Sequence, residues 1–388
     1  MRDPSSTSSS DGRRLAGKAA LLAGPFLLAA LGELALPPDA FTWRVVEAVK
    51  AVRVRAWPGM AYPGLRLARP DEIGELAGPT RLARRRPVVW VTDERGFRHD
   101  PASCPGRDYA AALVGDSNLW ASVLTQDDLP SARLAKALGA CVYPYSPFDM
   151  NRFLSDPAWA RTPPVVVYVT AQGAVGGLPE PQRDPPPAPP AWTRPLPARA
   201  LIALDRVLKF PLLRFAQAEL TRRTERAYRR LVLGYTGDRV EPLGFSRPGR
   251  DGSTLFSAHE LAAIPPDDAR LADAARKLGV WSRALAARGS RFIYLPVPAK
   301  SSVLHRLAGR EPDLTLTRLG PFLAREGVEY LDLWPEFRDA AARGESLYEP
   351  DDNHWGPAGV ARAMDRLAAR LRAGRPGTAS RPRAPPRS

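Results

Sequence analysis

Apolar residues recur along the chain in two alternating patterns. Short runs that are dense in Val, Leu, Ala and Tyr predict strands at 109–115, 141–145, 164–170, 290–296 and 328–333. Apolar positions spaced three and four apart predict helices at 119–138, 268–288, 315–326 and 357–371. Because these strands are apolar on both faces and alternate with helices, we predict an α/β fold with about five parallel strands.

A segment of different composition interrupts this alternation at about 176–267. Its first part is Pro-rich around 184–190, which excludes a helix or a central strand there. The stretch 201–233 then has a helical period and carries many Arg residues beside Leu, Phe and Tyr. Two interpretations stay open: an insertion helix packed on the domain, or a helix facing a membrane surface or an anionic polymer.

The N-terminus predicts export. A Ser-rich polar stretch and three cations, Arg13, Arg14 and Lys18, precede an uncharged run at 19–32. We expect a membrane anchor over 1–40; a cleaved signal peptide and a buried helix are the alternatives. Cations before the run place the N-terminus in the cytoplasm and the rest outside it, in the periplasm or the extracellular space. Residues 41–87 then read as a juxtamembrane connector, 88–372 as the main domain and 373–388 as a disordered basic tail.

Charge and cysteine content narrow the class of protein. The 388 residues contain 56 Lys and Arg against 41 Asp and Glu, a net charge of +15 that suits nucleic acid, anionic lipid or an acidic polymer. Part of the excess lies in the basic tail, so we expect no nucleic-acid partner. The two cysteines, Cys104 and Cys141, exclude a Cys-only zinc site. They fall at the same edge of adjacent predicted strands, so we expect a disulfide if the domain is exported; otherwise both are small buried apolar residues.

The sequence Gly115-Asp116-Ser117-Asn118 lies where the first strand of the alternating region ends and a helix begins. Ligands bind at this carboxyl edge in open α/β sheets, and a helix N-terminus offers backbone N–H groups to a developing oxyanion. Ser117 is therefore placed as a nucleophile. A Ser or Asp that only caps the helix is the alternative.

A serine nucleophile needs a base, and the base needs an orienting carboxylate. Among the four histidines only His354 has carboxylates at the second and third preceding positions. In an extended loop, residues two apart point the same way, so we expect Asp352 to orient His354. Asp351 is the alternative orienter if the loop is turned. We see no third or fourth ligand at a suitable spacing, so no metal is expected.

These two blocks resemble the first and last blocks of the SGNH hydrolase superfamily. Within it, the sequence Asp352-Asn353-His354-Trp355, with Gly359 before a terminal helix, is most similar to the membrane-associated alginate O-acetyltransferase-like branch. Two further segments match: 92–98, ahead of the strand that leads to Ser117, and 295–300, after the fourth predicted strand. The resemblance covers about 88–175 and 276–372.

The resemblance implies a three-layer, flavodoxin-like fold and acetyl transfer to or from a polysaccharide hydroxyl. It assigns Ser117 as nucleophile, His354 as general base and Asp352 as its orienter. The family's second-block Gly and third-block Asn have no clear match at 143–147 and 169–173. Candidates for oxyanion stabilisation and substrate binding are therefore Gln172, whose amide N–H is one possible replacement donor, together with Asn118, Ser146 and Trp355.

The expected activity is an exported O-acyltransferase that needs no cofactor. Its expected partners are a polysaccharide acceptor, the membrane and a membrane-bound protein that passes acyl groups across it, which the family resemblance implies. With water as acceptor the same chemistry gives a carbohydrate esterase. An SGNH-like module with impaired catalysis that binds polysaccharide through Trp159, Trp192 and Trp355 is the alternative from another class.

Overall fold

The computed structural model describes residues 59, 63–64, 66–77, 82–182 and 246–373. The predicted anchor at 1–40, the Pro-rich and Arg-rich part of the insertion, and the tail beyond residue 373 lie outside these residues. None of the helices in the described part of the chain combines the length and the apolar character that a membrane crossing requires.

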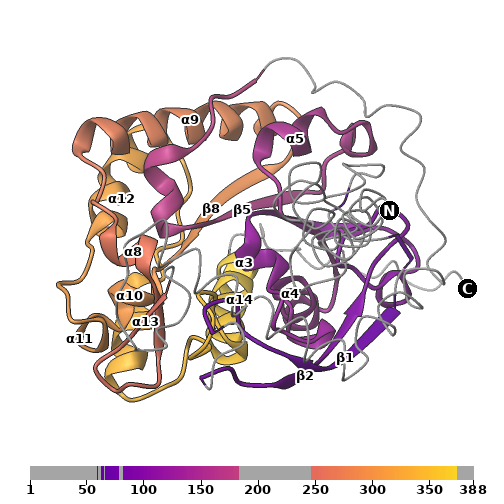
Figure 1. Cartoon of the computed structure of the whole chain (residues 1–388). Helices are drawn as coiled ribbons and strands as arrows, with labels where there is room; N and C mark the ends of the chain where they lie inside the picture. The colour runs from indigo at the N-terminus through magenta and orange to yellow at the C-terminus, as the bar shows by residue number, and fades with distance from the viewer. Residues whose placement is uncertain (1–58, 60–62, 65, 78–81, 183–245, 374–388) are drawn as a thin grey trace, which may run out of the picture.

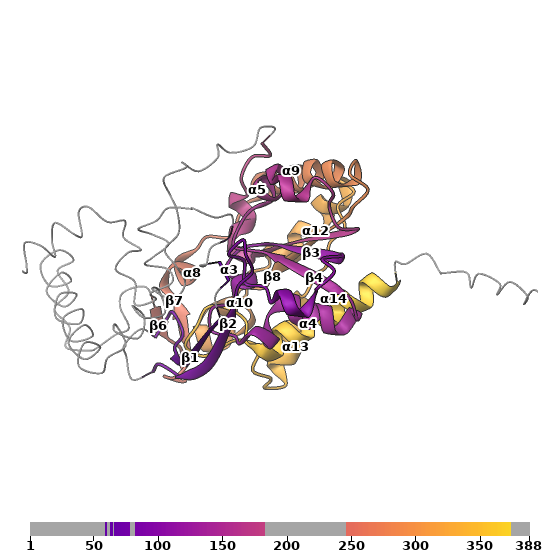
Figure 2. The same ribbon diagram turned by 90° about the vertical axis from the view of Figure 1, so that its right-hand side faces the viewer.

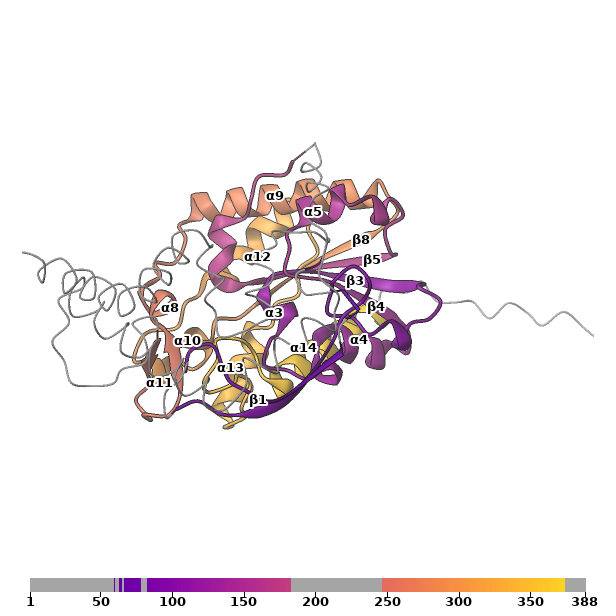
Figure 3. The same ribbon diagram turned by 45° about the vertical axis from the view of Figure 1, so that its right-hand side comes forward.

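Four parallel strands form the central sheet, in the order β4-β3-β5-β8 (Figure 3). The strands are β3 (Tyr109–Gly115), β4 (Cys141–Tyr145), β5 (Val165–Ala171) and β8 (Arg291–Val297). Most of their residues are buried, as expected for a sheet covered on both faces. The expected fifth strand at 328–333 makes only a single parallel bridge, between Tyr294 and Tyr330. The reason is local: Asp332 accepts a hydrogen bond from the Trp334 N–H (2.9 Å), which turns the chain into a helix.

Helices cover both faces of this sheet and make three layers (Figures 2 and 3). On one face lie α9 (Asp268–Ala286) and α12 (Thr315–Arg325), which pack against each other. On the other face α4 (Pro130–Leu138) packs against α14 (Pro357–Ala373). The expectation of a flavodoxin-like α/β fold is therefore confirmed. The shorter helices are α5 (Met150–Ser155), α8 (Ala258–Ala262), α10 (Lys300–Val303), α11 (His305–Ala308) and α13 (Trp334–Ala342).

The prediction of a single helix over 119–138 is wrong. The structure has a one-turn helix, α3 (Ser117–Trp120), which ends at Ala121 in the left-handed conformation (φ 43°). A 3-10 turn follows at Gln126–Asp128, and Pro130 occupies the first turn of α4, where its missing N–H costs nothing. The turn that carries Ser117 is consequently separated from α4 by residues 121–129, which are non-helical or 3-10 chain.

A hairpin outside the central sheet is formed by β1 (Arg66–Glu72) and β2 (Arg86–Val91), which pair antiparallel with Leu67 opposite Trp90 (Figure 1). Part of the segment expected to be a connector thus belongs to the folded structure. Leu76 and Ala77, which follow β1, are buried against Leu255. Leu255 begins β7 (Leu255–Ser257), which pairs with β6 (Ser246–Pro248) in the last part of the predicted insertion.

Cys104 and Cys141 form a disulfide, with their Cα atoms 5.6 Å apart. The bond ties the segment before β3 to the first residue of β4, so the pairing expected from the sequence is confirmed.

Replacing both cysteines by alanine should lower the free energy of unfolding by about 2–4 kcal/mol, because the bond closes a loop of 37 residues in the unfolded chain. Urea unfolding of the protein and of the double variant measures this change. The unmodified protein in reductant should unfold at the same urea concentration as the double variant; an unchanged midpoint in both cases would contradict the prediction.

Candidate active site

Ser117 lies at the first position of α3, directly beyond the carboxyl end of β3. Gly115 is required just before it, because a Cβ there would stand 1.9 Å from the carbonyl oxygen of Val169 on β5. The backbones of β3 and β5 can therefore approach closely where the nucleophile loop leaves the sheet. Ser117 is exposed, whereas the next residue, Asn118, is buried.

The carboxylate of Asp116 fixes this loop. It accepts hydrogen bonds from the backbone N–H of Asn118 (2.9 Å), from the Asn118 side-chain amide (3.0 Å) and from the N–H of Ala171 (2.5 Å). The Ser146 hydroxyl donates to the Asp116 carbonyl (2.7 Å). Asp116 thus caps α3 and ties it to the end of β5, which explains its place beside Ser117.

The structure brings Ser117, His354 and Asp352 together, although 237 positions separate the serine from the histidine. His354 Nε2 lies 2.8 Å from Ser117 Oγ, and Nδ1 lies 2.5 Å from Asp352 Oδ1. Because an ionised carboxylate only accepts, Nδ1 carries the proton toward Asp352, and in the neutral ring Nε2 is free to accept the serine proton. This is the geometry of a serine nucleophile with an oriented general base.

Asp352, rather than Asp351, orients the imidazole. Both carboxylates are fully buried, but that of Asp351 points away from the ring. It accepts the backbone N–H groups of Gly74 (2.9 Å) and Arg84 (2.8 Å) and forms an ion pair with Arg86. A Cβ at Gly74 would lie 2.0 Å from the Asp351 carbonyl oxygen, so only glycine permits this approach.

Lys300, at the start of α10, supports the histidine loop from the other side. Its ammonium is buried and donates to the backbone carbonyls of Glu349 (2.7 Å), Pro350 (3.1 Å) and Asp352 (2.8 Å). Three acceptors match the three protons of an ammonium. Burial lowers the pKa of Lys300 to about 8.

Arg98 supports the nucleophile loop in a similar way. Its buried guanidinium stacks on Trp90 of β2, 4.4 Å from the ring centre, and donates to the carbonyls of Trp120 (2.9 Å) and Ala121 (2.7 Å). These carbonyls belong to the end of α3. The motif at 92–98 thereby connects the hairpin to the helix that begins with Ser117.

Charges around His354 favour its protonated form. Burial by itself lowers the pKa of the imidazole, but the carboxylates of Glu75, Asp352 and Asp116 outweigh burial and raise it to about 9. Burial raises the pKa of Asp352, but the adjacent imidazole and backbone donors hold it well below its usual range. Each group of this pair thus favours the charged form of the other.

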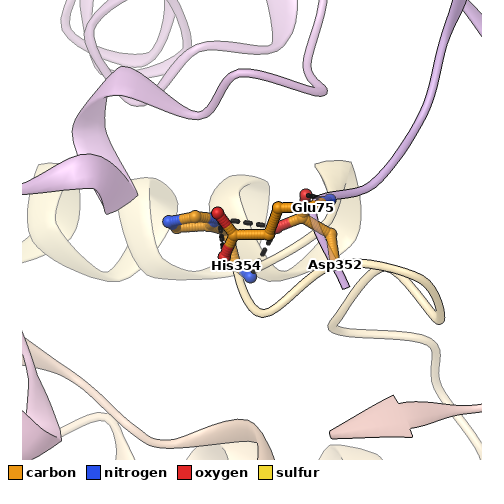
Figure 4. A group of neighbouring side chains, drawn as sticks. All are labelled: Glu75, Asp352 and His354. Atoms are coloured by element: carbon orange, nitrogen blue, oxygen red, sulfur yellow. Dashed lines mark hydrogen bonds and ion pairs between the residues drawn. The ribbon is translucent and has the colours of Figure 1, made fainter. Parts of the chain in front are cut away.

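Glu75 was not expected in the site, because it lies 277 positions before Asp352 in a segment interpreted as a connector. Figure 4 shows it beside Asp352 and His354. Within the described residues these three offer ligand-type atoms within 4.8 Å of one another. The Nδ1 proton is directed at Asp352, however, and this arrangement suits an imidazole between two carboxylates better than a cation. The expectation that no metal is needed stays a prediction.

The four residues predicted to stabilise an oxyanion or bind substrate make contacts within the fold, and their predicted roles stay predictions. All four are buried. Gln172 accepts from the Ala299 N–H (3.0 Å) and donates to the Asp313 carbonyl (3.3 Å), so its amide joins three loops. Trp355 donates from its indole N–H to the Asn118 carbonyl (3.0 Å), while Asn118 and Ser146 both bond Asp116. These contacts hold the loops that carry Ser117 and His354, and a fully buried Trp355 cannot stack on a sugar.

The alternative tryptophan surface is not formed by the described residues: Trp159 is buried, and Trp192 lies outside them. Trp159 instead lines a cleft of about 530 Å³ at the opposite end of the strands, together with Tyr109, Tyr143 and Arg107. This cleft adjoins the amino end of β3, whereas Ser117 follows its carboxyl end. It therefore does not belong to the triad.

Comparison with known families gives one match: residues 247–385 match the SGNH hydrolase-like domain of acetyltransferase AlgX. The matched region contains Lys300, Asp352 and His354 but begins after Ser117. No curated protein and no solved structure matches the chain.

Lys300→Met should lower the free energy of unfolding by about 3 kcal/mol or more, because it leaves three buried carbonyls without a donor. It should also reduce turnover, since the same carbonyls lie in the histidine loop. Thermal and urea unfolding measure the first effect. Lys136→Met, on the exposed side of α4, is the matched control and should change stability by less than about 0.5 kcal/mol. Equal stability of the two variants would refute the role of Lys300.

Proposed function

Because residues 247–385 match the SGNH hydrolase-like domain of acetyltransferase AlgX, we propose that the protein is a serine-dependent O-acyltransferase. It moves an acetyl group to a hydroxyl of a polysaccharide through Ser117, His354 and Asp352. The observation that carries the proposal is the continuous hydrogen-bonded series from Asp352 Oδ1 through the imidazole to an exposed Ser117 hydroxyl.

In the first half-reaction, His354 Nε2 accepts the Ser117 proton as Oγ attacks the acyl carbonyl. Collapse of the tetrahedral intermediate breaks the bond to the donor's leaving group, which takes the proton from Nε2. The acyl group is then an ester of Ser117, and His354 is neutral again. Asp352 holds the ring and stabilises the imidazolium that forms between these steps.

In the second half-reaction, a sugar hydroxyl gives its proton to Nε2 and attacks the Ser117 ester. The new ester forms on the sugar, and Ser117 Oγ leaves with the proton returned by Nε2. The Ser117 N–H is the first candidate oxyanion donor in both halves, because a residue at the first position of a helix has no intrahelical acceptor for its N–H.

An esterase is the second candidate, and the exposure of Ser117 favours it. Water that reaches the Ser117 ester takes the same proton route as a sugar hydroxyl and releases the free acid. The two activities therefore differ only in how well a bound acceptor excludes water from Nε2.

Export is part of the proposal, with a membrane-associated donor protein as partner. The Cys104–Cys141 disulfide supports it, because such bonds persist mainly in oxidising compartments. An acyl donor made in the cytoplasm would then have to be passed across the membrane. We therefore propose a periplasmic or extracellular catalytic domain.

Incubation with p-nitrophenyl acetate should add one acetyl group to the protein, mapped by peptide mass spectrometry to Ser117. Ser117→Ala should abolish the adduct and reduce p-nitrophenol release on the order of 10⁴- to 10⁶-fold, as for loss of other serine nucleophiles. Ser155→Ala is the control, because that hydroxyl only bonds the Arg152 carbonyl. An adduct that persists in Ser117→Ala would exclude Ser117 as nucleophile.

Transfer and hydrolysis are separated by supplying an oligosaccharide acceptor with the same ester. A transferase should form acetylated oligosaccharide and release less free acetate as the acceptor concentration rises. An esterase should release acetate at a rate independent of acceptor and should also deacetylate an acetylated oligosaccharide. The second pattern would replace the transferase proposal by the esterase.

A further inference from the structure

Glu75 makes two separate contacts with the catalytic pair. Its backbone N–H donates to Asp352 Oδ2 (2.9 Å), and its side-chain Oε1 lies 3.5 Å from His354 Nδ1 (Figure 4). The Nδ1 proton is already directed at Asp352 Oδ1, at 2.5 Å. Glu75 Oε1 therefore acts on the ring mainly through its charge, and the backbone contact acts on the orientation of Asp352.

The two carboxylates that face Nδ1 differ in exposure. Asp352 is fully buried, whereas 41% of the Glu75 side chain is exposed. Asp352 therefore has a fixed place in the packed loop, whereas the Glu75 carboxylate is in contact with solvent. An exposed charge is screened by solvent but still acts strongly at so short a distance.

The other charged groups near His354 are Asp116, Lys300 and Asp351. Asp116 acts from the nucleophile loop, and the Ser117 hydroxyl meets Nε2. Lys300 contacts the backbone of the histidine loop rather than the ring, and Asp351 is paired with Arg86. Glu75 is the one of these groups that can be neutralised without removing a buried support of the loop.

We propose that Glu75 is a positioning residue that sets, through its carboxylate charge, the pH range in which His354 accepts the proton of Ser117. Its backbone contact orients Asp352 and is independent of that charge. Only the kinetic readout of this inference rests on the proposed function; the protonation of His354 is measured without turnover.

The sign follows from the charge. A carboxylate beside the ring stabilises the imidazolium and raises the pKa of His354 above its ordinary value. Below that pKa the ring carries a proton on Nε2 and cannot accept another, so activity rises with pH. Removing the Glu75 charge lowers the pKa, and a decrease of one unit gives about tenfold more neutral imidazole at pH 7.

The direct test is NMR titration of the imidazole nitrogens in the unmodified protein, Glu75→Gln and Glu75→Asp. Glu75→Gln keeps the shape of the side chain and the backbone N–H, and should lower the pKa of His354 by about one unit. Glu75→Asp keeps the charge and should restore most of the shift. Glu326→Gln is the matched control, because that carboxylate is similarly exposed but lies beside Arg283 on the outer helices. A His354 titration that is the same in Glu75→Gln and the control would overturn the proposal.

The kinetic test is the pH profile of p-nitrophenol release from p-nitrophenyl acetate. At pH 6–7, Glu75→Gln should be about three- to tenfold faster than the unmodified protein, because more of its His354 is neutral. Above pH 9 it should be equal or slower, because a less basic imidazole accepts the serine proton less readily. The charges that act on Lys300 come from Asp352, Glu260, Asp351 and Glu349 and not from Glu75, so we expect its titration to be common to all variants. A uniform loss of rate at every pH would mean that Glu75 is only structural; absence of turnover in every variant would instead count against the proposed function.

Discussion

The site depends on the burial of two adjacent carboxylates, Asp351 and Asp352. Burying a charge is costly unless its oxygen atoms are fully bonded, and here the donors come from segments far away in the sequence. The loop after β1 supplies the N–H groups of Gly74 and Glu75, and β2 supplies the guanidinium of Arg86. If these donors were removed, the loop that carries His354 would have to open to water. The hairpin is therefore as much a part of the site as the parallel sheet.

The carboxylates that act on His354, which are Glu75, Asp352 and Asp116, have opposite effects on its two protonation states. In the proposed reaction they stabilise the imidazolium that forms when Ser117 gives up its proton, and they also reduce the fraction of His354 that is neutral beforehand. A buried orienter such as Asp352 must impose both effects permanently. The charge of a more exposed carboxylate such as Glu75 is partly screened by solvent, so its effect on the imidazole is weaker.

The sequence was sufficient for the four strands of the central sheet, although it predicted a fifth at 328–333, and for the pair of loops at the carboxyl edge. Local patterns locate a buried strand and a histidine with a carboxylate two positions before it, and topology then brings them together. Glu75 could not be found this way, because nothing near position 75 marks it as a neighbour of residue 352. Spacing identifies a loop but not the direction of a side chain, so it did not reveal that Gln172 bonds Ala299 and Asp313 or that Trp355 bonds Asn118. The broken helix after Ser117 had one visible signal, Pro130, which begins a new helix rather than continuing one.

The family match covers His354 but not Ser117. Contacts within the fold must therefore account for the position of Ser117 relative to His354. This position is set by packing: α14 lies beside α4, on the face of the sheet below β3, and the histidine loop leads directly into α14. Trp355, at this junction, donates to the Asn118 carbonyl in the first turn of α3. Gly359 allows α14 to begin there, since a Cβ would lie 2.4 Å from the Leu347 carbonyl oxygen. A larger residue at 359 would push the helix away and carry His354 with it, so the distance between base and nucleophile is set by how closely this helix can approach.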